Sequence, residues 1–451
     1  MKRVAVVGSG ISGLATAHAL ARQAQVTLFE AGCWFGGHTH TVDVTLPGAI
    51  GPASSLACRP LTHGVDTGFL VFNHRTYPNL VRLFADLQVE TAASEMSFSV
   101  QMRAPGSAAI EWSGNNLNSV FAQRRNLLRP RFLRMLRDIV RFIKLTTALA
   151  QRGVEGEMAQ PIGDFLDQHR FDSTFRDWYF LPMIGCIWSC PTDQMLRFPL
   201  ATMIRFCHNH GLLQVSGRPQ WHTVKGGARH YVDKLLQCIP DARLNTPVRS
   251  VRRLPSGAGV MLATDTGSER FDDVVLACHS DQSLALLADA SALERDVLGA
   301  IRYHPNRAVL HTDTQVLPRR QRAWAAWNYA RAEDSGREQS AVCLHYLINR
   351  LQPLPWAQPV LVSLNPDPAH PPQPDKVLAA FEYSHPIFDS AAIAAQQGLP
   401  ALQGRGHVWF CGAWTRYGFH EDGLVSALDI VDRLRKAWQT APAGVPEPAP
   451  A

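Results

Sequence analysis

Residues 4–30 read VAVVGSGISGLATAHALARQAQVTLFE and decide the fold. Residues 4–7 form a short apolar run of the kind that makes a buried parallel strand. Apolar residues recur at helical spacing over residues 14–21, and residues 26–29 predict a second strand that ends at Glu30. The glycine pattern alone would be weak evidence. Strand, G-x-G-x-x-G turn, helix, strand and terminal acid together predict a dinucleotide-binding βαβ unit.

Each residue of this turn has a physical role in holding a dinucleotide. Gly8 allows the tight turn, Gly10 lets the backbone approach a pyrophosphate, and Gly13 lets the helix pack on the strands. The helix N-terminus offers N–H groups and a positive dipole end to the phosphates. Glu30 accepts a hydrogen bond from a ribose 2′-hydroxyl and repels a 2′-phosphate, which disfavours NADP. The predicted cofactor contacts in this unit are Gly8, Gly10, Ile11, Ser12, Gly13, Glu30 and Ala31.

The composition is that of an ordinary globular protein. The chain has 451 residues, 46% of them hydrophobic and 18% charged, which excludes wholesale disorder, collagen and coiled coil. A net charge of +6 is too mild at this length to indicate a nucleic-acid partner. No run of about 18 uncharged apolar residues predicts a transmembrane helix. Nine cysteines, an odd number spread thinly, indicate free thiols in a reducing compartment, so we expect a cytoplasmic protein.

A second glycine pair, Gly36-Gly37 followed by His38-Thr39, comes just after Glu30. With this pair, the chain resembles the superfamily of flavin-dependent amine oxidases, protoporphyrinogen oxidases and phytoene desaturases. It is most similar to a bacterial subgroup described only as predicted NAD/FAD-binding or amine-oxidase-like proteins. The resemblance covers residues 1 to about 436. It rests on residues 66–73, 75–80, 187–189, 219–227 and 418–423, which read DTGFLVFN, RTYPNL, IWS, PQWHTVKGG and GFHEDG.

The resemblance implies that the cofactor is FAD. The stretch from Gly36 to Thr39 then wraps the diphosphate and ribityl, and the backbone of Val248 meets the adenine. The C-terminal helix directs its N-terminus at the pyrimidine edge of the flavin, where a positive dipole end stabilises the reduced form. The chain has Ala413 where many relatives carry an acid that holds the ribityl chain. The further predicted contacts are Gly36, Gly37, His38, Thr39, Gly68, Phe69, Val248, Gly412, Asp422, Gly423 and Leu424.

The resemblance also implies the architecture: an α/β fold in which a discontinuous Rossmann-like FAD-binding domain carries an inserted α+β substrate domain. We expect FAD-binding parts at 1–75, 220–285 and 401–438. The substrate parts are 76–219, which looks mostly helical, and 286–400, which is β-rich. Residues 439–451 have little to bury and are expected to be disordered.

Within the FAD-binding parts, local signals predict several elements. We expect strands at 66–73 and 408–412 and a helix opened by Gly226-Gly227. A second helix is expected to start at Gly423. Its buried face would carry Leu424, Ala427, Leu428 and Val431.

Four residues near the start of the C-terminal helix are candidates for catalysis: Trp414, Tyr417, His420 and Glu421. Trp414 and Tyr417 follow the last strand, where ligands gather in α/β sheets, although core packing is the alternative for each ring. His titrates near neutral pH, so a His420–Glu421 pair beside the flavin could tune a proton there. The alternative is that both residues position backbone at the helix start. Asp422 is expected to be the N-cap.

We predict no metal site and no covalent flavin link. Adjacent residues such as 420–422 do not share a helix face, and no second Cys or His pair joins Cys186 and Cys190 at zinc spacing. Cys411 does not match the position of covalent flavin attachment in monoamine oxidases, so the resemblance implies non-covalent FAD.

Residues 124–144 are strongly basic. They hold seven arginines and Lys144 against one acid, Asp138. Leu133, Leu136, Val140 and Ile143 form an apolar stripe, which Phe132, Met135, Ile139 and Phe142 widen, and Arg134, Arg137, Arg141 and Lys144 line the other side. A basic amphipathic helix predicts peripheral docking on anionic lipid, here the inner face of the cytoplasmic membrane. The alternative is a solvated face over a broad core stripe.

One dinucleotide fingerprint and no C-x-x-C redox pair argue against a pyridine-nucleotide-dependent monooxygenase or disulfide reductase. We therefore expect an FAD-dependent oxidoreductase that passes a hydride from an organic substrate to flavin N5. The basic helix favours a small hydrophobic substrate, such as an unsaturated lipid or polyene. The alternatives are an amine oxidase acting on a small amine, a reduced-flavin isomerase, and a flavoprotein scaffold for a lipid-modifying partner. Oxygen and a quinone both remain open as acceptor, as does the oligomeric state.

Overall fold

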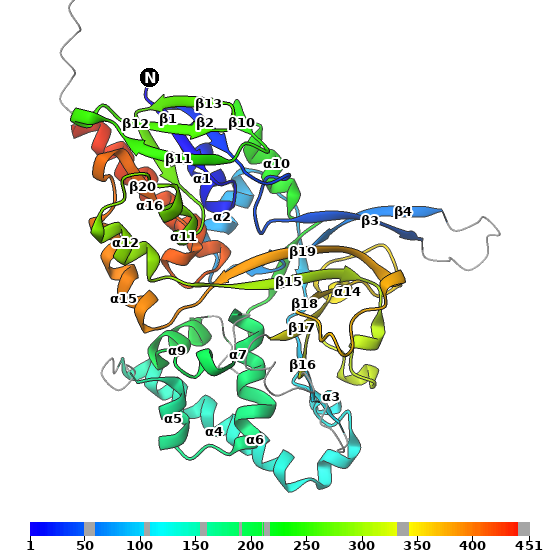
Figure 1. Ribbon diagram of the computed structural model, residues 1–451. Coiled ribbons are helices and arrows are strands. Elements are labelled where there is room, and N and C mark those ends of the chain that lie inside the picture. The colour runs from blue at the N-terminus through cyan, green and yellow to red at the C-terminus, as the bar shows by residue number, and fades with distance from the viewer. Residues whose placement is uncertain are drawn as a thin grey trace, which may run out of the picture. The chain divides into compact units, whose positions relative to one another are not determined.

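The strand predicted at residues 4–7 lies at the centre of a parallel sheet. In the computed structural model of the chain, β1 (Arg3–Val7) pairs with β2 (Gln25–Phe29) on one side and with β14 (Asp273–Leu276) on the other (Figure 1). β10 (Asp241–Arg243) and β20 (Val408–Phe410) complete the order β10-β2-β1-β14-β20. Ligands bind where such a strand order reverses, here between β1 and β14. The structure describes residues 1–48, 59–102, 109–153, 160–188, 192–209, 211, 217–331 and 342–440.

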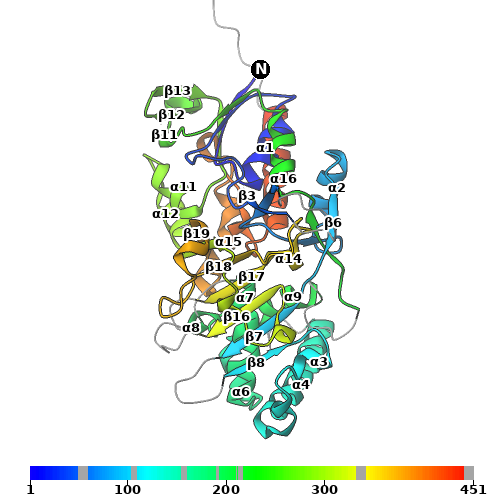
Figure 2. The ribbon, with the colours of Figure 1, turned by 90° about the vertical axis from the view of Figure 1, so that its right-hand side faces the viewer.

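Two helices pack against each other beside this sheet. They are α1 (Ile11–Leu20) and α16 (His420–Thr440), and both views of the ribbon show them side by side (Figures 1 and 2). Leu14, Ala17 and Leu20 of α1 and Ala427 and Leu434 of α16 are fully buried. Burial of these apolar side chains is what holds the helices in place.

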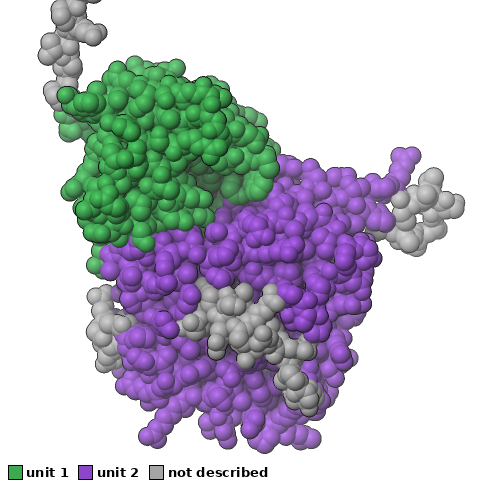
Figure 3. Space-filling view, in the orientation of Figure 1, with its two compact units in different colours: residues 1–37, 233–299, 396–451 green, residues 38–232, 300–395 purple. Residues whose placement is uncertain are grey.

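The contacts divide the chain into two compact units (Figure 3). Unit 1 comprises Met1–Gly37, Asp233–Gly299 and Gln396–Ala451, and unit 2 comprises His38–Val232 and Ala300–Ala395. The chain changes from one unit to the other after residues 37, 232, 299 and 395, whereas the sequence predicted these domain boundaries after residues 75, 219, 285 and 400. The largest difference concerns residues 38–75, whose strands pair within unit 2 with one another and with residues 221–222.

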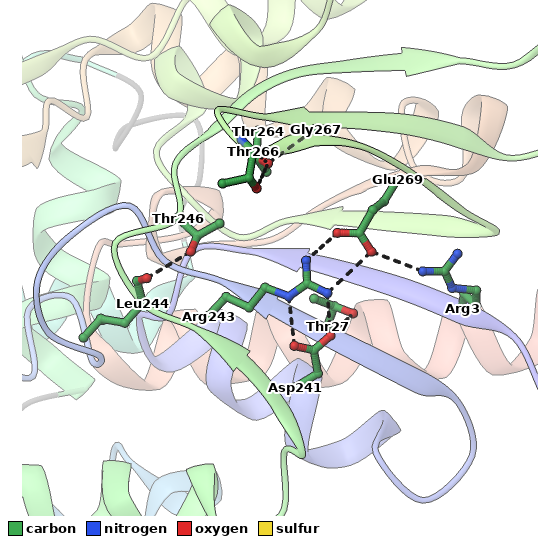
Figure 4. A network of polar contacts seen from close by, with 10 residues as sticks. All are labelled: Arg3, Thr27, Asp241, Arg243, Leu244, Thr246, Thr264, Thr266, Gly267 and Glu269. Carbon is green, nitrogen blue, oxygen red and sulfur yellow. Dashed lines mark hydrogen bonds and ion pairs between the residues drawn. The ribbon is translucent and has the colours of Figure 1, made fainter.

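In unit 1, a meander of three antiparallel strands joins the parallel sheet. It consists of β11 (Val248–Arg253), β12 (Val260–Thr264) and β13 (Gly267–Phe271). Figure 4 shows how Arg243 of β10 forms ion pairs with both Asp241 and Glu269, while Arg3 of β1 reaches Glu269 at 3.3 Å. Thr27 of β2 donates to Asp241 at 2.8 Å. The network therefore links three strands of the parallel sheet to β13.

In unit 2, seven strands form the main sheet, in the order β19-β15-β18-β17-β16-β7-β8. All neighbours are antiparallel except the pair β16 and β7. Their bounds are β19 (Val377–Pro386), β15 (Tyr303–His311), β18 (Leu361–Leu364), β17 (Cys343–Leu347), β16 (Trp327–Arg331), β7 (Phe98–Met102) and β8 (Ile110–Ser113).

The two faces of this sheet differ in chemistry although both are buried. One face carries apolar side chains such as Val100, Trp112 and Tyr329, and Trp112 contacts the rings of Phe132 and Tyr179 from the helices. The other face carries a transverse row of polar residues, Ser363, His345, Asn328 and Ser99, at one register. Ser99 donates to Asn328 at 2.7 Å, and Ser363 meets His345 at 2.6 Å. Each buried polar group on this row is thus hydrogen-bonded.

The helices of unit 2 form an aromatic core. Phe142 of α4 contacts four other phenylalanine rings: Phe165, Phe171, Phe175 and Phe180. The helices are α4 (Pro130–Arg152), α5 (Ile162–Gln168), α6 (Ser173–Phe175), the π-helix η2 (Arg176–Phe180), α7 (Leu181–Trp188), α8 (Thr192–Met195) and α9 (Leu200–Asn209).

The remaining elements are short. The strands are β3 (Thr41–Pro47), β4 (Pro60–Asp66), β5 (Phe72–Asn73), β6 (Thr91–Ser94) and β9 (Trp221–Val224). The α-helices are α2 (Pro78–Asp86), α3 (Leu117–Val120), α10 (Arg229–Leu236), α11 (Ser280–Leu286), α12 (Ala292–Gly299), α14 (Ile348–Leu351) and α15 (Ser390–Gly398). The 3-10 helices are η1 (Arg124–Leu128), η3 (Pro255–Gly257), η4 (Thr314–Val316), η5 (Gln321–Ala323), η6 (Pro374–Lys376), η7 (Leu399–Ala401), η8 (Arg405–His407) and η9 (Ala413–Thr415).

Three predicted elements differ in the structure. The expected strand at 66–73 is the end of β4, a turn, and the two-residue β5. Residues 76–219 contain many helices but also β6, β7 and β8, which the sequence analysis missed. The C-terminal helix starts at His420 rather than Gly423. Its residue Leu428, expected in the core, is 37% exposed, and Ile430 is buried in its place.

The apolar stripe expected on α4 also differs. Leu133 and Val140 are 44% and 48% exposed, and the buried side of the helix carries Phe132, Met135 and Phe142. In the described part of the chain, no helix is long and apolar enough to cross a membrane. Ser189, Cys190 and residues 441–451, which the sequence analysis discussed, lie outside the described residues.

Candidate cofactor site

Gly8 and Gly13 are required by the packing of unit 1 itself. Gly8 follows β1 with a φ of +100°, which disfavours any side chain, and a Cβ there would lie 3.0 Å from the carbonyl oxygen of Ala277. A Cβ on Gly13 would lie only 1.8 Å from the carbonyl oxygen of Gly8. Gly8 therefore forms the turn and Gly13 allows the close approach of α1, as the sequence predicted.

Gly10 is different, because nothing in the protein requires a glycine there. Its φ of −61° and ψ of 176° suit any residue, and a Cβ on it would meet nothing within 4 Å. Gly10 is also the N-cap of α1 and makes no side-chain capping hydrogen bond. The space beside Gly10 and the helix N-terminus fit a pyrophosphate, which the first-turn N–H groups of Ile11, Ser12 and Gly13 could bind.

Glu30, half-buried at the end of β2, is held in place by the turn. Its Oε2 accepts hydrogen bonds from the N–H of Ser9 at 2.9 Å and the hydroxyl of Ser9 at 2.5 Å, and its Oε1 accepts from the N–H of Gly32 at 2.7 Å. A carboxylate offers about four lone-pair sites, so capacity remains for a ribose hydroxyl. Its role in binding ribose stays a prediction.

Ser9 is a residue that the sequence analysis missed. Its Oγ also accepts from the N–H of Gly36 at 3.1 Å, so it connects the first glycine turn to the second glycine pair. Gly37 has a φ of +57°, and a Cβ on it would lie 3.2 Å from the Cα of Gly10. The two glycine segments of unit 1 therefore lie side by side. Ala31 is exposed just after Glu30.

The N-terminus of α16 lies against that of α1. A Cβ on Gly423 would come 2.8 Å from Ile11 Cγ2, and the hydroxyl of Ser12 donates to the carbonyl of Gly423 at 2.9 Å. Ser426, also missed from the sequence, accepts from the N–H of Gly412 at 2.9 Å and so holds the end of β20 to this helix. Two helix starts with positive dipole ends thus meet near the carboxyl ends of β1 and β20.

Asp422 caps α16 from a different position than expected. The helix starts at His420, so Asp422 is its third residue rather than its N-cap, and its carboxylate accepts from the N–H of Phe419 at 2.9 Å. This is the return bond of a capping box. Burial raises the pKa of Asp422 to about 6. Leu424, which is also predicted to contact the cofactor, is buried.

The four catalytic candidates lie in η9, in the turn that follows it and in the first turn of α16. Trp414 is 2% exposed, and its indole N–H donates to the carbonyl of Cys278 at 3.0 Å, so it anchors the loop after β20 to the loop after β14. Tyr417 and His420 are half-buried, and Glu421 is buried in the first turn of α16. Their catalytic roles stay predictions, as does the adenine contact of Val248, which begins β11.

The predicted contacts in unit 2 also lie together. The N–H of Phe69 donates to the carbonyl of His38 at 2.8 Å, and a Cβ on Gly68 would lie 2.3 Å from that same oxygen, which explains the glycine. Thr39 is buried and hydrogen-bonded to the hydroxyl of Tyr231 at 2.5 Å. The four predicted contacts of unit 2 therefore lie close together: His38, Thr39, Gly68 and Phe69.

Asp66 is the centre of this part of unit 2, and the sequence analysis gave it no role. Its carboxylate accepts from the hydroxyl of Thr41 at 2.5 Å, the N–H of Ala228 at 2.9 Å and the side-chain amide of Gln352 at 2.8 Å. Burial raises its pKa to about 7. The sequence around Asp66 offers little local signal for this, because its neighbours Gly64, Val65, Thr67 and Gly68 form no apolar run around the acid.

Two further observations concern other cofactors and flavin attachment. Among the described residues, no three His, Cys, Asp or Glu side chains come together in a way that could hold a metal ion. Cys411 is fully buried beside Thr16, at 3.9 Å between Sγ and Oγ1, and burial raises the pKa of its thiol to about 12. The turn after β14 reads Ala277-Cys278-His279 and contains no glycine, unlike the turn after β1.

Comparison with known proteins gives the family. The model for flavin containing amine oxidoreductase matches residues 11–324. Solved structures similar in fold include a CLA-producing fatty acid isomerase from P. acnes, with a TM-score of 0.64, 15% identity, and 96% of this chain and 98% of that chain covered. A cyclohexylamine oxidase from Brevibacterium oxydans IH-35A has a TM-score of 0.63 and 16% identity, with 96% of this chain and 99% of that chain covered. A putrescine oxidase bound to putrescine has a TM-score of 0.63 and 13% identity, with the same two coverages. A comparison with curated proteins gives no match.

The matched segment spans more than half of the chain, and unit 1 contains the dinucleotide turn, the second glycine pair and the C-terminal helix start in one place. The chain therefore belongs to the family of flavin containing amine oxidoreductases and is a flavin-dependent oxidoreductase.

Proposed function

We propose that the protein binds FAD non-covalently and oxidises a neutral hydrophobic substrate. The observation that carries the cofactor assignment is Gly10, a glycine that neither backbone conformation nor packing explains. When bound, FAD supplies the two-electron chemistry by accepting a hydride from a substrate C–H bond at N5. In this proposal the start of α1 binds the pyrophosphate, Glu30 orients the ribose, and the start of α16 stabilises negative charge at the pyrimidine edge.

The burial of Cys411 supports a non-covalent cofactor. A thiol with a pKa of about 12 stays protonated at neutral pH, and the thiolate is the reactive form. Acid precipitation of the yellow holoprotein should therefore release all of its flavin into the supernatant as FAD. Flavin that stays in the washed pellet would contradict this part of the proposal.

The buried carboxylates of unit 2 favour a neutral substrate over an amine. A substrate ammonium needs a carboxylate or an aromatic cage. Four carboxylates of unit 2 are 1% exposed, and each is already occupied by protein donors. Asp66 accepts from Thr41, Ala228 and Gln352, and Glu111 binds Arg320 and the N–H of Arg319. Asp138 binds Arg141, and Asp313 binds Lys376 and two backbone N–H groups.

Within the described residues, unit 2 therefore offers no fully buried carboxylate that lacks a protein partner. Its helices instead build the aromatic core around Phe142, and one face of its main sheet is apolar. An unsaturated acyl chain or a polyene needs no carboxylate partner. One structural relative is a CLA-producing fatty acid isomerase, whereas two others are a cyclohexylamine oxidase and a putrescine oxidase bound to putrescine, so both substrate classes belong in the test.

The test is anaerobic reduction of the flavin by candidate substrates. Purified holoprotein is mixed with an ester of an unsaturated fatty acid, a polyene, a bacterial lipid extract, putrescine or cyclohexylamine, and the flavin absorption band is followed. We expect bleaching by a lipid and no bleaching by the amines. Bleaching by an amine alone would overturn the substrate class. A lipid whose double bonds move without lasting bleaching would assign an isomerase instead.

A further inference from the structure

Exposed apolar side chains gather in one part of unit 2. Nine large apolar residues are exposed in the described part of the chain, and five of them lie between residues 117 and 140. These five residues are Leu117, Leu127, Leu128, Leu133 and Val140. Together with the basic residues around them, we call them the patch. Leu128 and Leu117 are the most exposed of them, at 87% and 79%. Such a concentration on the surface of a soluble domain marks an interaction site.

The local structure holds these residues together. The guanidinium of Arg124, in η1, donates to the carbonyl of Phe121 and to the side chain of Asn118, which ties η1 to α3. The ring of Phe121 contacts Phe132 of α4 at 5.9 Å between centroids. Figure 2 shows α3 next to α4, and η1, which lies between them in sequence, contacts α4. The patch is thus one surface built from α3, η1 and α4.

Along α4 the exposed residues alternate between apolar and basic. Phe132, Met135 and Phe142 face the core. On the opposite side, Leu133, Arg137, Val140 and Lys144 follow at intervals of four, three and four residues, which places them in one line along the helix. A helix that buries one face in protein normally presents a polar face to water. This one presents leucine and valine between cations.

The positive charge of the patch is only partly balanced by carboxylates. Its exposed cations are Arg124, Arg125, Arg131, Arg134, Arg137 and Lys144, of which Arg134 pairs with Asp172 and Arg137 with Asp138. Residues 109–153 contain two acids, Glu111 and Asp138, and both are buried and bonded to arginines. Arg125 donates to the carbonyl of Ala109 at 2.9 Å, a bond that leaves its charge uncompensated. Burial, and to a smaller extent the neighbouring Arg125 charge, lower the pKa of Arg129.

We propose that this patch docks the protein on an anionic lipid bilayer, with the leucines inserted at the boundary between headgroups and acyl chains. Clustered cations attract the negative surface of such a membrane, and apolar side chains between them bury area that a purely ionic partner would leave in water. The charge complementarity selects a lipid surface, and the projecting leucines explain why the surface is not simply a solvated cationic face. The inference does not depend on the substrate proposed above.

The test is co-sedimentation of the full-length holoprotein with vesicles. Vesicles of phosphatidylglycerol mixed with phosphatidylcholine should pull down the protein, and vesicles of phosphatidylcholine alone should not. Binding should weaken as salt is raised, because the cations act through a screened field. The double variant Arg124→Gln/Arg125→Gln should lower the partition coefficient by about fivefold per charge. Leu117→Ser/Leu128→Ser should lower it at high salt as well, where only apolar burial remains.

Matched controls separate the patch from general effects of charge and hydrophobicity. Arg22→Gln/Arg295→Gln removes two exposed cations of unit 1, and Leu61→Ser/Leu378→Ser removes two exposed leucines outside the patch. Both controls should bind as the parent protein does, and every variant should keep its flavin content and circular dichroism. Equal binding to neutral and anionic vesicles, or patch variants that bind like their controls, would overturn the proposal.

Discussion

The three glycines of the first turn are needed for different reasons, and this difference identifies the ligand side of the turn. Gly8 and Gly13 are pressed against backbone, so protein packing explains them. Gly10 has ordinary dihedral angles and open space where a side chain would be. The sequence pattern predicts all three glycines equally well. The coordinates are what separate a structural glycine from one that leaves room for a ligand.

The variant Gly10→Ala should fold normally and bind FAD poorly. An alanine fits the backbone there and meets no protein atom, so the unfolding temperature of the flavin-free protein should not fall. Crowding a pyrophosphate with an extra methyl group should cost about 1–3 kcal/mol, or roughly 5- to 150-fold in FAD affinity. The measurements are the flavin-to-protein ratio and the melting temperature of each form.

The matched control is Gly13→Ala, whose Cβ would clash with the carbonyl of Gly8 at 1.8 Å. This variant should be strongly destabilised even without flavin. Full flavin binding by Gly10→Ala would show that the space beside Gly10 does not hold the pyrophosphate.

His311 on the polar face of the main sheet of unit 2 makes stability depend on pH. Its Nδ1 accepts from the N–H of Asp313 at 3.1 Å and its Nε2 lies 2.6 Å from the hydroxyl of Ser363. Burial lowers its pKa to about 4. Between about pH 6.5 and pH 4 the unfolded chain takes up a proton that the folded protein does not, so stability falls as the pH falls through this window, by on the order of 3 kcal/mol.

The variant His311→Gln should therefore be less stable than the parent at pH 7, and its stability should depend less on pH. At pH 7 the variant should be less stable by about 1–3 kcal/mol, because buried hydrogen bonds are lost. As the pH falls towards 4, its deficit relative to the parent should shrink. Ser363→Ala removes a hydrogen bond but keeps the imidazole, so it should keep the parental pH dependence. Urea unfolding midpoints across pH would measure this, and parallel curves for His311→Gln and the parent would contradict it.

At the scale of elements, Glu269 on β13 joins the meander to the parallel sheet through Arg243 and Arg3. Its side chain is about one-third exposed, so solvent screens these ion pairs. We expect Glu269→Gln to cost about 1 kcal/mol or less, with a larger loss at low salt than at high salt. The control Asp265→Asn breaks the well-exposed pair with Arg249 and should have no measurable effect. A loss that does not change with salt would mean that packing, rather than charge, accounts for the role of Glu269.

The elements that the sequence predicts well are those with a local signal. The βαβ unit, the helix after Gly226-Gly227 and the strand near residue 408 form where periodicity and glycine placement require them. The strand β7 alternates apolar and polar residues, a local strand signal that was overlooked, and this pattern alone would place Ser99 and Gln101 in water. Both are buried, and Ser99 is bonded to Asn328, a residue 229 positions away in the sequence. A polar side chain buried by a distant partner leaves no sign in a local pattern.

The start of α16 illustrates the same limit over one turn of helix. Asp422 reads as an N-cap and Gly423 as the first helical residue, yet the helix starts at His420 and Asp422 bonds back to Phe419. An Asp at the third position of a capping box and an Asp at the N-cap look alike in sequence. The choice of candidate site residues does not change with this difference, because the resemblance to flavoproteins depends on which residues are present and not on where the helix begins. Their roles stay predictions.

For the whole molecule, the sequence predicts a chain that crosses repeatedly between two units, and the structure has two units with such crossings. The strand order within each unit depends on contacts between residues hundreds of positions apart, such as β1 with β14 and β7 with β16. No local pattern contains that information. The assignment to a flavin family does not depend on the strand order, because the dinucleotide unit is continuous in sequence.

We propose that electrons enter this flavoprotein from an organic substrate and not from a nicotinamide nucleotide. The proposal rests on the presence of one G-x-G-x-x-G turn in the sequence and on the turn after β14, which has no glycine. The most direct test is to add NADH or NADPH to the anaerobic holoprotein and follow its flavin absorption band. We predict that the band stays unchanged with either nucleotide and bleaches only with an oxidisable organic substrate. Rapid bleaching by NADH or NADPH would contradict the account and make the protein a nucleotide-dependent reductase or monooxygenase.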